Sequence, residues 1–215
     1  MKENEDYALV LNQILTRDNV NIANVIGTER FTLLNIILNE DVQLTKQSKI
    51  LISKESEEVK KVNNRLSYND LSNEEKKELE NAVHSIIIRN EDRYVDFFNM
   101  QSKEKNQLHF LEGISRKTGS KILDEKENGD FKSFEDIEKR VGFIDDCENL
   151  IAKRVLYELI ELPQKKNKTS YLFVNAKYKT SKKTPEYDSF KEDDSFFIEK
   201  LKKEGVLKQL GKKIN

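Results

Sequence analysis

Apolar residues in the first third of the chain gather in short runs with polar residues between them. The runs cover residues 7–11, 31–38 and 50–52, and a weaker one covers residues 65–68. They are rich in residues that favour strands, and Asn, Asp and Gly separate them. Several short strands before any clear helical period predict a small OB-like β-barrel over residues 1–71. A plain antiparallel sheet without a binding role fits the same pattern and stays open as the alternative.

Residues 72–104 have the period of an amphipathic helix. Ser72 and Glu75 form a capping box at its start, in which each side chain accepts the backbone N–H of the other residue. Apolar and aromatic residues then recur on one face, at Leu79, Val83, Ile86, Ile87, Tyr94, Phe97 and Phe98. We interpret this face as core, and a base-stacking platform is the alternative. The helix is expected to connect the barrel to the segment that follows.

A tight turn between two helices is predicted in the segment that begins at Leu108 and reads L-x-x-L-E-G-I-S-R-K-T-G-S-K-I-L. Leu108 and Leu111 mark the end of the first helix. Gly113 supplies the positive φ that such a turn needs, and Ile114 is expected to insert into the core. Ser115 stands at the N-cap position of the second helix.

The start of that second helix suits a phosphate group. The first backbone N–H groups of a helix have no partner within the helix, so they are free to bind an anion. Three basic side chains add positive charge to the same turn. The predicted contact residues are Gly113, Ile114, Ser115, Arg116, Lys117 and Lys121. The pattern is that of a helix-hairpin-helix, a module that holds the nucleic-acid backbone without reading bases.

The pattern of this turn recurs further along the chain. Ser133 can cap a helix, Gly142 stands at a place comparable to the first glycine, and the next helix is expected to begin at Asp145. One such hairpin has little core of its own, so two are expected to stack into a compact four-helix unit over residues 105–162. Asp145 and Asp146 would repel phosphate. We therefore assign a structural role to the second turn and backbone contact to the first.

The remaining residues, 163–215, form a lysine-rich tail. Residues 164–183 carry seven lysines and no acidic residue, which gives this window a charge of +7. Salt-dependent contact with nucleic acid is assigned to Lys165, Lys166 and Lys168. A short strand is predicted at residues 171–174 and a short helix at residues 195–210.

The overall charge does not by itself favour a nucleic-acid binder. The chain of 215 residues has a net charge of −1, and 36% of its residues are charged. Residues 105–161 hold ten basic and thirteen acidic side chains, so the predicted hairpin unit has a charge of −3. Because most nucleic-acid-binding domains are basic, the prediction depends on where the charges lie. The acidic excess favours a protein-interaction module instead.

No constellation of catalytic or metal-binding residues stands out. The two histidines, His84 and His109, are interpreted as packed or surface residues. The single cysteine, Cys147, has no cysteine partner at metal-ligand spacing. Helix capping explains the acidic residues in 145–148, and there is no phosphate-binding glycine-rich loop. We therefore expect no enzymatic activity, no cofactor and no metal.

Two features bear on the cellular location. No apolar run is long enough to span a bilayer, and the acidic N-terminus lacks the apolar stretch of a signal peptide. A single cysteine excludes an internal disulfide and fits a reducing compartment. The chain is therefore expected to act in the cytoplasm, without membrane contact.

Five segments form a recognisable set: residues 7–11, 30–34 and 93–99, the first glycine turn, and residues 134–137. Together they resemble an archaeal domain-of-unknown-function family, family 655, whose members are described as nucleotide- or nucleic-acid-binding proteins. The resemblance implies an OB-like domain followed by a tandem helix-hairpin-helix domain in the archaeal cytoplasm, with no enzymatic activity. This chain departs from the usual hairpin pattern in two places. Ser115 replaces a second glycine, and Gly119 stands where alanine is common.

Two hypotheses of function follow. The first is a non-enzymatic nucleic-acid-binding protein that holds the phosphate backbone at the first turn and single-stranded segments on an OB-like surface. Tyr7, Phe31 and Tyr68 are its candidate stacking residues, and Phe31 is also suited to the core. The family setting favours RNA over DNA as the partner. The second hypothesis is a scaffold that binds a protein partner and makes no contact with nucleic acid.

Overall fold

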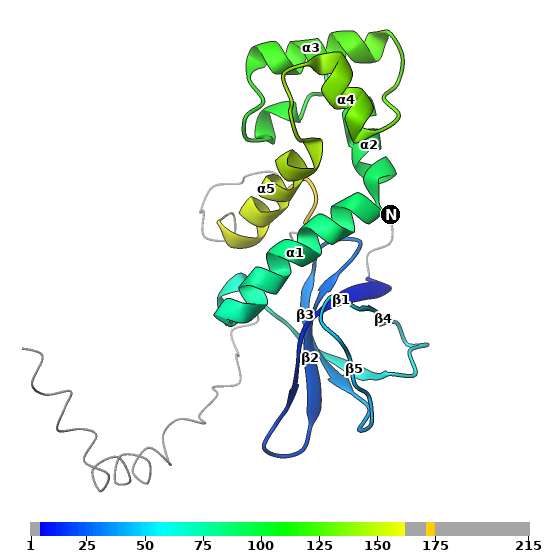
Figure 1. The fold of residues 1–215 in the computed structure, drawn as a ribbon, viewed down its shortest axis with the longest axis vertical. Coiled ribbons are helices and arrows are strands. Elements are labelled where there is room, and N and C mark those ends of the chain that lie inside the picture. Colours follow the sequence, from blue (N-terminus) through cyan, green and yellow to red (C-terminus); the bar gives the residue numbers. More distant parts are fainter. Residues whose placement is uncertain (1–4, 162–170, 175–215) are drawn as a thin grey trace, which may run out of the picture. The chain divides into compact units, whose positions relative to one another are not determined.

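The structure, a computed structural model, describes residues 5–161 and 171–174. In this part the fold is α+β, with a curled five-stranded antiparallel sheet followed by five α-helices (Figure 1). The strands are β1 (Tyr7–Leu15), β2 (Asn21–Gly27), β3 (Leu33–Leu38), β4 (Lys49–Leu51) and β5 (Val59–Arg65). The helices are α1 (Asn73–Arg89), α2 (Glu91–Asn99), α3 (Arg116–Glu127), α4 (Phe134–Val141) and α5 (Cys147–Ile160). Two single-turn 3-10 helices, η1 (Tyr68–Asp70) and η2 (Leu108–Phe110), lie in the connections.

The sheet has the strand order β4-β1-β2-β3-β5 and is apolar on both faces near its centre. One face holds a cluster of buried side chains that the loop residues Val42 and Leu44 cover. The cluster consists of Ala8, Val10, Ala23, Val25, Leu34, Ile36, Leu38, Ile50 and Ile52. Because side chains alternate along a strand, Leu9 and Leu11 point to the other face, where α1 contacts β1 (Figure 1). Burial on both faces explains the unbroken apolar run at the start of β1.

A row of polar side chains crosses the sheet from its edge to the start of α1. Asn63 donates a hydrogen bond to Asn35 at 2.9 Å, and Asn35 donates one to Asn24 at 2.8 Å. Asn24 in turn donates to Oε1 of Glu75 at 2.7 Å, and Oε2 of Glu75 accepts the backbone N–H of Ser72 at 2.8 Å. The carboxylate of Glu75 is buried, so these donors supply the hydrogen bonds that its charge requires. This polar row ties three strands to one helix.

The predicted strands are partly confirmed and partly wrong. β1 and β4 are confirmed, although β1 extends to Leu15. β3 begins at Leu33 because Phe31 has the left-handed φ of +54°, and the predicted strand at residues 65–68 is wrong because Tyr68 starts a 3-10 helix. β2 and β5 were not predicted, since asparagines and a glycine make β2 look like a turn and β5 has only two apolar residues.

The predicted connecting helix is two helices. The capping box at Ser72 is confirmed, with the Glu75 N–H donating to the Ser72 hydroxyl. At Asn90 the backbone leaves the helical conformation, and the Asn90 side chain donates to the Ile86 carbonyl at 2.7 Å. Such side-chain bonds to the backbone compete with the helix and explain the break. Residues 100–104 are not helical, so a connecting helix up to residue 104 is wrong.

The aromatic residues of α2 belong to the core, as predicted. Tyr94 and Phe98 are fully buried. The ring of Phe173, from the short segment 171–174, lies edge-on against Tyr94 at a centroid distance of 5.6 Å and against Phe97 at 5.2 Å. The aromatic rings of α2 therefore hold a distant part of the chain in place. Because they pack against Phe173 and the core, they are not available for base stacking.

Segment 171–174 does not form the predicted strand. It pairs with no strand in the described part of the chain, and α5 holds it through the buried carboxylate of Glu158. That carboxylate accepts the backbone N–H groups of Leu172, Phe173 and Val174 at 2.8, 3.0 and 2.9 Å. The predicted helix at residues 195–210 lies outside the described residues.

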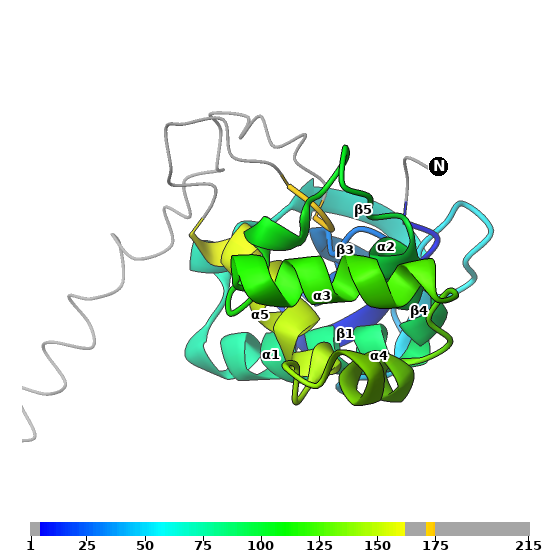
Figure 2. The ribbon, with the colours of Figure 1, turned by 90° about the horizontal axis from the view of Figure 1, so that it is seen from above.

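The last three described helices contact one another in sequence, and the last of them contacts α1. α4 contacts both α3 and α5, and α5 lies along α1 (Figures 1 and 2). His84 of α1 and Glu148 of α5 join the last pair, with Nδ1 and Oε1 2.7 Å apart. In the part of the chain that the structure describes, no helix is long and apolar enough to cross a membrane.

Candidate nucleic-acid interface

The first glycine turn has the predicted backbone conformation but a shorter leading helix. Gly113 has a φ of +91°, and the Ile114 N–H donates to the Leu111 carbonyl at 3.2 Å. Leu108 and Leu111 are buried. The helix that precedes the turn is only the 3-10 turn η2, which Arg154 holds by donating to the Phe110 carbonyl at 3.0 Å.

Ile114 lies just before the first turn of α3. The prediction that it inserts into the core is wrong. It is only half-buried. A Cβ built on Gly119 would meet Cγ2 of Ile114 at 3.8 Å, so the two residues face each other across the start of the helix. Ile114 therefore lies against α3 at Gly119, with space between them for one methyl group.

The start of α3 presents free amides to solvent. Ser115 is the N-cap, and its hydroxyl accepts the Thr118 N–H at 3.1 Å, as predicted. The N–H groups of Arg116 and Lys117 have no acceptor among the described residues. Ser115, Arg116 and Lys117 are all exposed residues. The geometry is that of an open anion site at a helix N-terminus.

The three predicted cations differ in their surroundings. Within the described part of the chain, Arg116 and Lys117 take part in no ion pair. Lys121 instead binds Glu125 one turn along α3, with Nζ and Oε1 2.6 Å apart. This hydrogen bond, together with nearby Arg140, lowers the pKa of Glu125 below its usual value, so the carboxylate is charged. Lys121 is thus paired within its own helix, whereas Arg116 and Lys117 are not paired within the described residues.

A hollow of about 290 Å³ adjoins the open amides. It lies between the segment that leads into η2 and the start of α3, and His109 stands exposed at its edge. Its lining residues are Asn106, Leu108, His109, Ile114, Ser115, Arg116, Gly119 and Ser120. No local sequence signal marks the contribution of Asn106, His109 and Ser120, because the hollow forms only when the two segments fold together.

The second glycine turn adjoins the first. Gly142 ends α4 with a φ of +67°, and Phe143 follows it with 53% of its surface exposed. The ammonium group of Lys117 lies 4.9 Å from the centre of the Phe143 ring, within the range of a cation–π contact. The N-cap of α5 is Asp146, whose carboxylate accepts the Asn149 N–H at 2.8 Å, so a helix start at Asp145 is wrong by one residue.

The remaining predicted residues fall in three places. Lys165, Lys166 and Lys168 lie outside the described residues. Phe31 is fully buried and belongs to the core. Tyr7 is 41% exposed with the Lys49 ammonium 4.1 Å from its ring centre, and Tyr68 is half-buried beneath Lys76. None of these residues lies in the first glycine turn, since Tyr7 begins β1 and Tyr68 begins η1.

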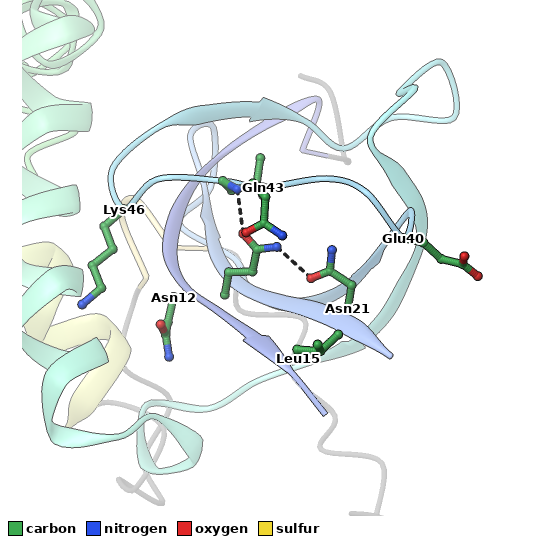
Figure 3. Close-up of a pocket in the computed structure, with 8 residues that line it drawn as sticks. Asn12, Leu15, Asn21, Glu40, Gln43 and Lys46 are labelled. Atoms are coloured by element: carbon green, nitrogen blue, oxygen red, sulfur yellow. Dashed lines mark hydrogen bonds between the residues drawn. The ribbon is translucent and has the colours of Figure 1, made fainter. Parts of the chain in front are cut away.

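A second hollow, of about 360 Å³, lies beside the end of β1 and the start of β2 (Figure 3). Its polar side chains hold the loop that crosses the sheet. Gln13 donates to Asn21 Oδ1 at 2.7 Å, and Asn21 donates to the Val42 carbonyl at 2.8 Å. Lys46 pairs with Glu74, and Glu40 points away from the other labelled side chains (Figure 3). Because its amides are used to hold the loop, we assign no binding role to this hollow.

The residues considered for metal or nucleophilic chemistry have structural partners. Cys147 is buried at the start of α5, and burial raises the pKa of its thiol well above the usual range. The thiol therefore stays protonated at neutral pH and is a poor nucleophile. His109 lies against the ring of Phe110, with a centroid distance of 4.0 Å. Within the described residues, no group of three His, Cys, Asp or Glu side chains could hold a metal ion.

Substitutions of two glycines test the geometry of this turn. Gly113→Val is expected to lower the free energy of unfolding by about 2 kcal/mol, because a β-branched residue resists a positive φ. Gly119→Ala is the matched change at a helical glycine with space for a methyl group, and it is expected to stabilise the chain by about 0.5–1 kcal/mol. Urea unfolding of both variants measures the difference. Equal stability of the Val variant and the wild type would contradict the turn.

Comparisons with known proteins identify the family. The family model described as "Protein of unknown function (DUF655)" matches residues 10–175. Uncharacterized protein MJ0038 of Methanocaldococcus jannaschii is 32% identical over 181 residues, which are 80% of this chain and 81% of that protein. The crystal structure of Af1531 from Archaeoglobus fulgidus, of the same family, is similar with a TM-score of 0.70 and 35% identity, and the match covers 80% of this chain and 100% of that chain. The archaeal relatives agree with the resemblance of the five sequence segments, and the chain belongs to the DUF655 family.

Proposed function

We propose that the protein binds nucleic acid by holding the phosphate backbone at the first glycine turn. The observation that carries this proposal is the pair of backbone amides without an acceptor at the exposed residues Arg116 and Lys117, whose side chains are cations without an ion pair in the described part of the chain. A phosphate placed there would accept hydrogen bonds from the amides and would be attracted by both side chains and the helix dipole. Such contacts do not depend on the base sequence, so the binding is nonspecific or selective for structure.

The interpretation of the helices as a tandem helix-hairpin-helix belongs to this proposal. Two positive-φ glycines, Gly113 and Gly142, each precede a capped helix, and their turns are in contact through Lys117 and Phe143. The short 3-10 turn η2 stands where the leading helix of the first copy would be. The backbone-binding role is kept for the first turn because Asp145 and Asp146 are exposed beside the second.

The interpretation of the sheet as an OB-like surface is the second part of the proposal. The curled sheet is open, because the described edge strands β4 and β5 do not pair with each other. Exposed Tyr7 beside Lys49 offers an aromatic ring and a positive charge together, the combination that OB-type proteins use for single strands. Lys60 and Lys61 add exposed positive charge along β5. RNA is the partner we favour, following the family setting of the sequence motifs.

Binding to a short single-stranded oligouridine at rising salt concentration tests the proposal. Arg116→Glu with Lys117→Glu is expected to weaken binding by about tenfold or more and to reduce the salt slope by about 0.7 for each phosphate that the variant no longer binds. Lys77→Glu with Lys153→Glu makes the same change in charge at exposed positions on α1 and α5 and is the matched control. Fluorescence anisotropy with labelled RNA and DNA of the same length gives the affinities and the preference between them.

Two outcomes would count against this function. Absence of binding by the wild-type chain at low salt would reject a nucleic-acid partner and favour a protein-interaction module, which the acidic excess of residues 105–161 supports. An equal loss of affinity in both double variants would show that binding follows total charge and not the geometry of the first turn.

A further inference from the structure

Phe143 is exposed although its neighbours are buried. It exposes 53% of its surface, whereas Val141 and Ile144 on either side of the turn expose only 2% and 7%. Of the phenylalanines in the described residues, it is the only one that is mostly exposed. The left-handed φ of Gly142 turns the chain at this point, so Phe143 lies on the outside of the corner while both flanking residues enter the core. The exposure of the ring therefore follows from the turn at Gly142.

The Lys117 side chain connects the exposed ring to the proposed phosphate site. Lys117, which supplies one of the two open amides at the start of α3, places its ammonium group 4.9 Å from the ring centre. The contact joins the two glycine turns, which are far apart in the sequence. A nucleotide whose phosphate binds the amides of α3 would thus have an aromatic surface within its immediate surroundings.

Apart from the Lys117 ammonium, the nearest charged residues after Phe143 in the sequence are acidic, which disfavours a phosphate at this ring. Asp145 and Asp146 follow the ring closely in the sequence and are exposed, and Asp146 keeps its carboxylate at the N-terminus of α5 through its bond to Asn149. Negative charge at this turn repels a phosphate but leaves contact with the flat face of a base unopposed. The two turns therefore differ in the part of a nucleotide that each can hold.

We propose that Phe143 stacks on an unpaired base of the strand whose phosphate is held at the start of α3. This inference rests on the proposed nucleic-acid-binding function and adds a selectivity to it. A base in a duplex has both faces covered by its neighbours, so only a single-stranded or unpaired nucleotide offers a face to the ring. The interface consequently prefers single strands over duplexes, although the phosphate contacts alone would accept both.

Measurements on Phe143→Ala separate the stacking contact from the phosphate contact. We expect affinity for a single-stranded oligouridine to fall by about 5- to 150-fold, the range that corresponds to loss of one base–aromatic stack. Affinity for a duplex RNA of the same length is expected to stay within about twofold of the wild type, because the amides and Arg116 remain. Phe143→Trp restores single-strand binding, whereas Phe143→Leu, which is apolar but has no ring, does not.

A fluorescent base gives an independent readout, and a second exposed residue gives the control. An oligonucleotide that carries 2-aminopurine is expected to lose fluorescence on binding the wild type and the Trp variant but not the Ala variant. Met100→Ala changes an apolar residue that is 75% exposed, and it is expected to leave both affinities unchanged. Because Phe143 is a surface residue, thermal unfolding of each variant is expected to match that of the wild type.

The outcomes distinguish this inference from the function on which it rests. If Arg116→Glu with Lys117→Glu abolishes binding while Phe143→Ala binds single strands as the wild type does, the stacking contact is rejected and the phosphate site stands. An equal loss of single-strand and duplex binding in Phe143→Ala also rejects stacking. Wild-type chain that binds no nucleic acid would overturn both, and Phe143 would then be a contact for a protein partner.

Discussion

Glu158→Gln is expected to lower the free energy of unfolding by about 3–5 kcal/mol, the range measured when one partner of a buried ion pair is removed. The carboxylate is fully buried and accepts four hydrogen bonds. Oε1 accepts from Arg154 Nε at 2.7 Å and from the Leu172 N–H, and Oε2 accepts from the N–H groups of Phe173 and Val174. An amide in this position turns one acceptor into a donor that faces other donors, and it removes the negative charge that faces the buried Arg154 guanidinium.

Two further variants connect this loss to the segment that Glu158 holds. Glu80→Gln makes the same chemical change at an exposed position of α1 and is expected to leave the urea midpoint unchanged. Phe173→Ala removes the ring that packs on Tyr94 and Phe97 and is expected to destabilise the chain by about 3–5 kcal/mol. In the double variant the total loss is expected to be smaller than the sum of the two single losses, because both act by releasing segment 171–174. Full additivity, or a Glu158→Gln variant as stable as the control, would contradict this role of Glu158.

Arg140→Lys is expected to cost about 2–3 kcal/mol, because an ammonium group cannot replace the planar guanidinium that holds the connection between α3 and α4. The Arg140 side chain is only 22% exposed, and its guanidinium lies 4.4 Å from the ring centre of buried Phe131. It donates to the carbonyl groups of Glu125, Gly129 and Asp130 and to the carboxylate of Asp136. A single cation thus binds carbonyl groups in the last turn of α3 and in the loop that follows it.

Hydrogen exchange locates the effect of the Arg140 substitution. The amides of residues 125–131 are expected to exchange faster in Arg140→Lys, while those of the sheet keep their protection. Lys139→Met removes an exposed charge from the neighbouring position on α4 and serves as the control. Uniformly faster exchange across the whole chain, or no change in exchange, would show that Arg140 does not hold this connection.

The helix starts could be predicted from the sequence because their chemistry is local. Ser72, Ser115 and Ser133 each accept a backbone N–H from the third residue that follows, as predicted, and this depends only on a few neighbouring residues. The positive φ of Gly113 is local in the same way. The neutralisation of Lys121 by Glu125 also has a local signal, because the two residues are spaced by one helical turn.

The features that the sequence could not show depend on contacts between distant residues. β5 is a strand because β3 pairs with it, although its own residues are mostly polar. The break at Asn90 depends on a side chain that competes with the helix, and nothing in the apolar period marks it. The contact of Lys117 with Phe143 joins two turns that only folding brings together. The open amides of the candidate site could therefore be predicted from the local sequence. The position of Phe143 beside Lys117 could not.

The polar row from Asn63 through Asn35 and Asn24 to Glu75 has a consequence for how the sheet is aligned. A slip of one residue in any of these strands would send its asparagine to the opposite face and interrupt the donors that lead to a buried anion. A shifted register would thus leave a buried carboxylate without hydrogen bonds, which costs free energy. This holds even at β5, which has too few hydrophobic side chains to fix its register. The register of β5 therefore depends on Asn63 and not on the exposed charged residues of the strand.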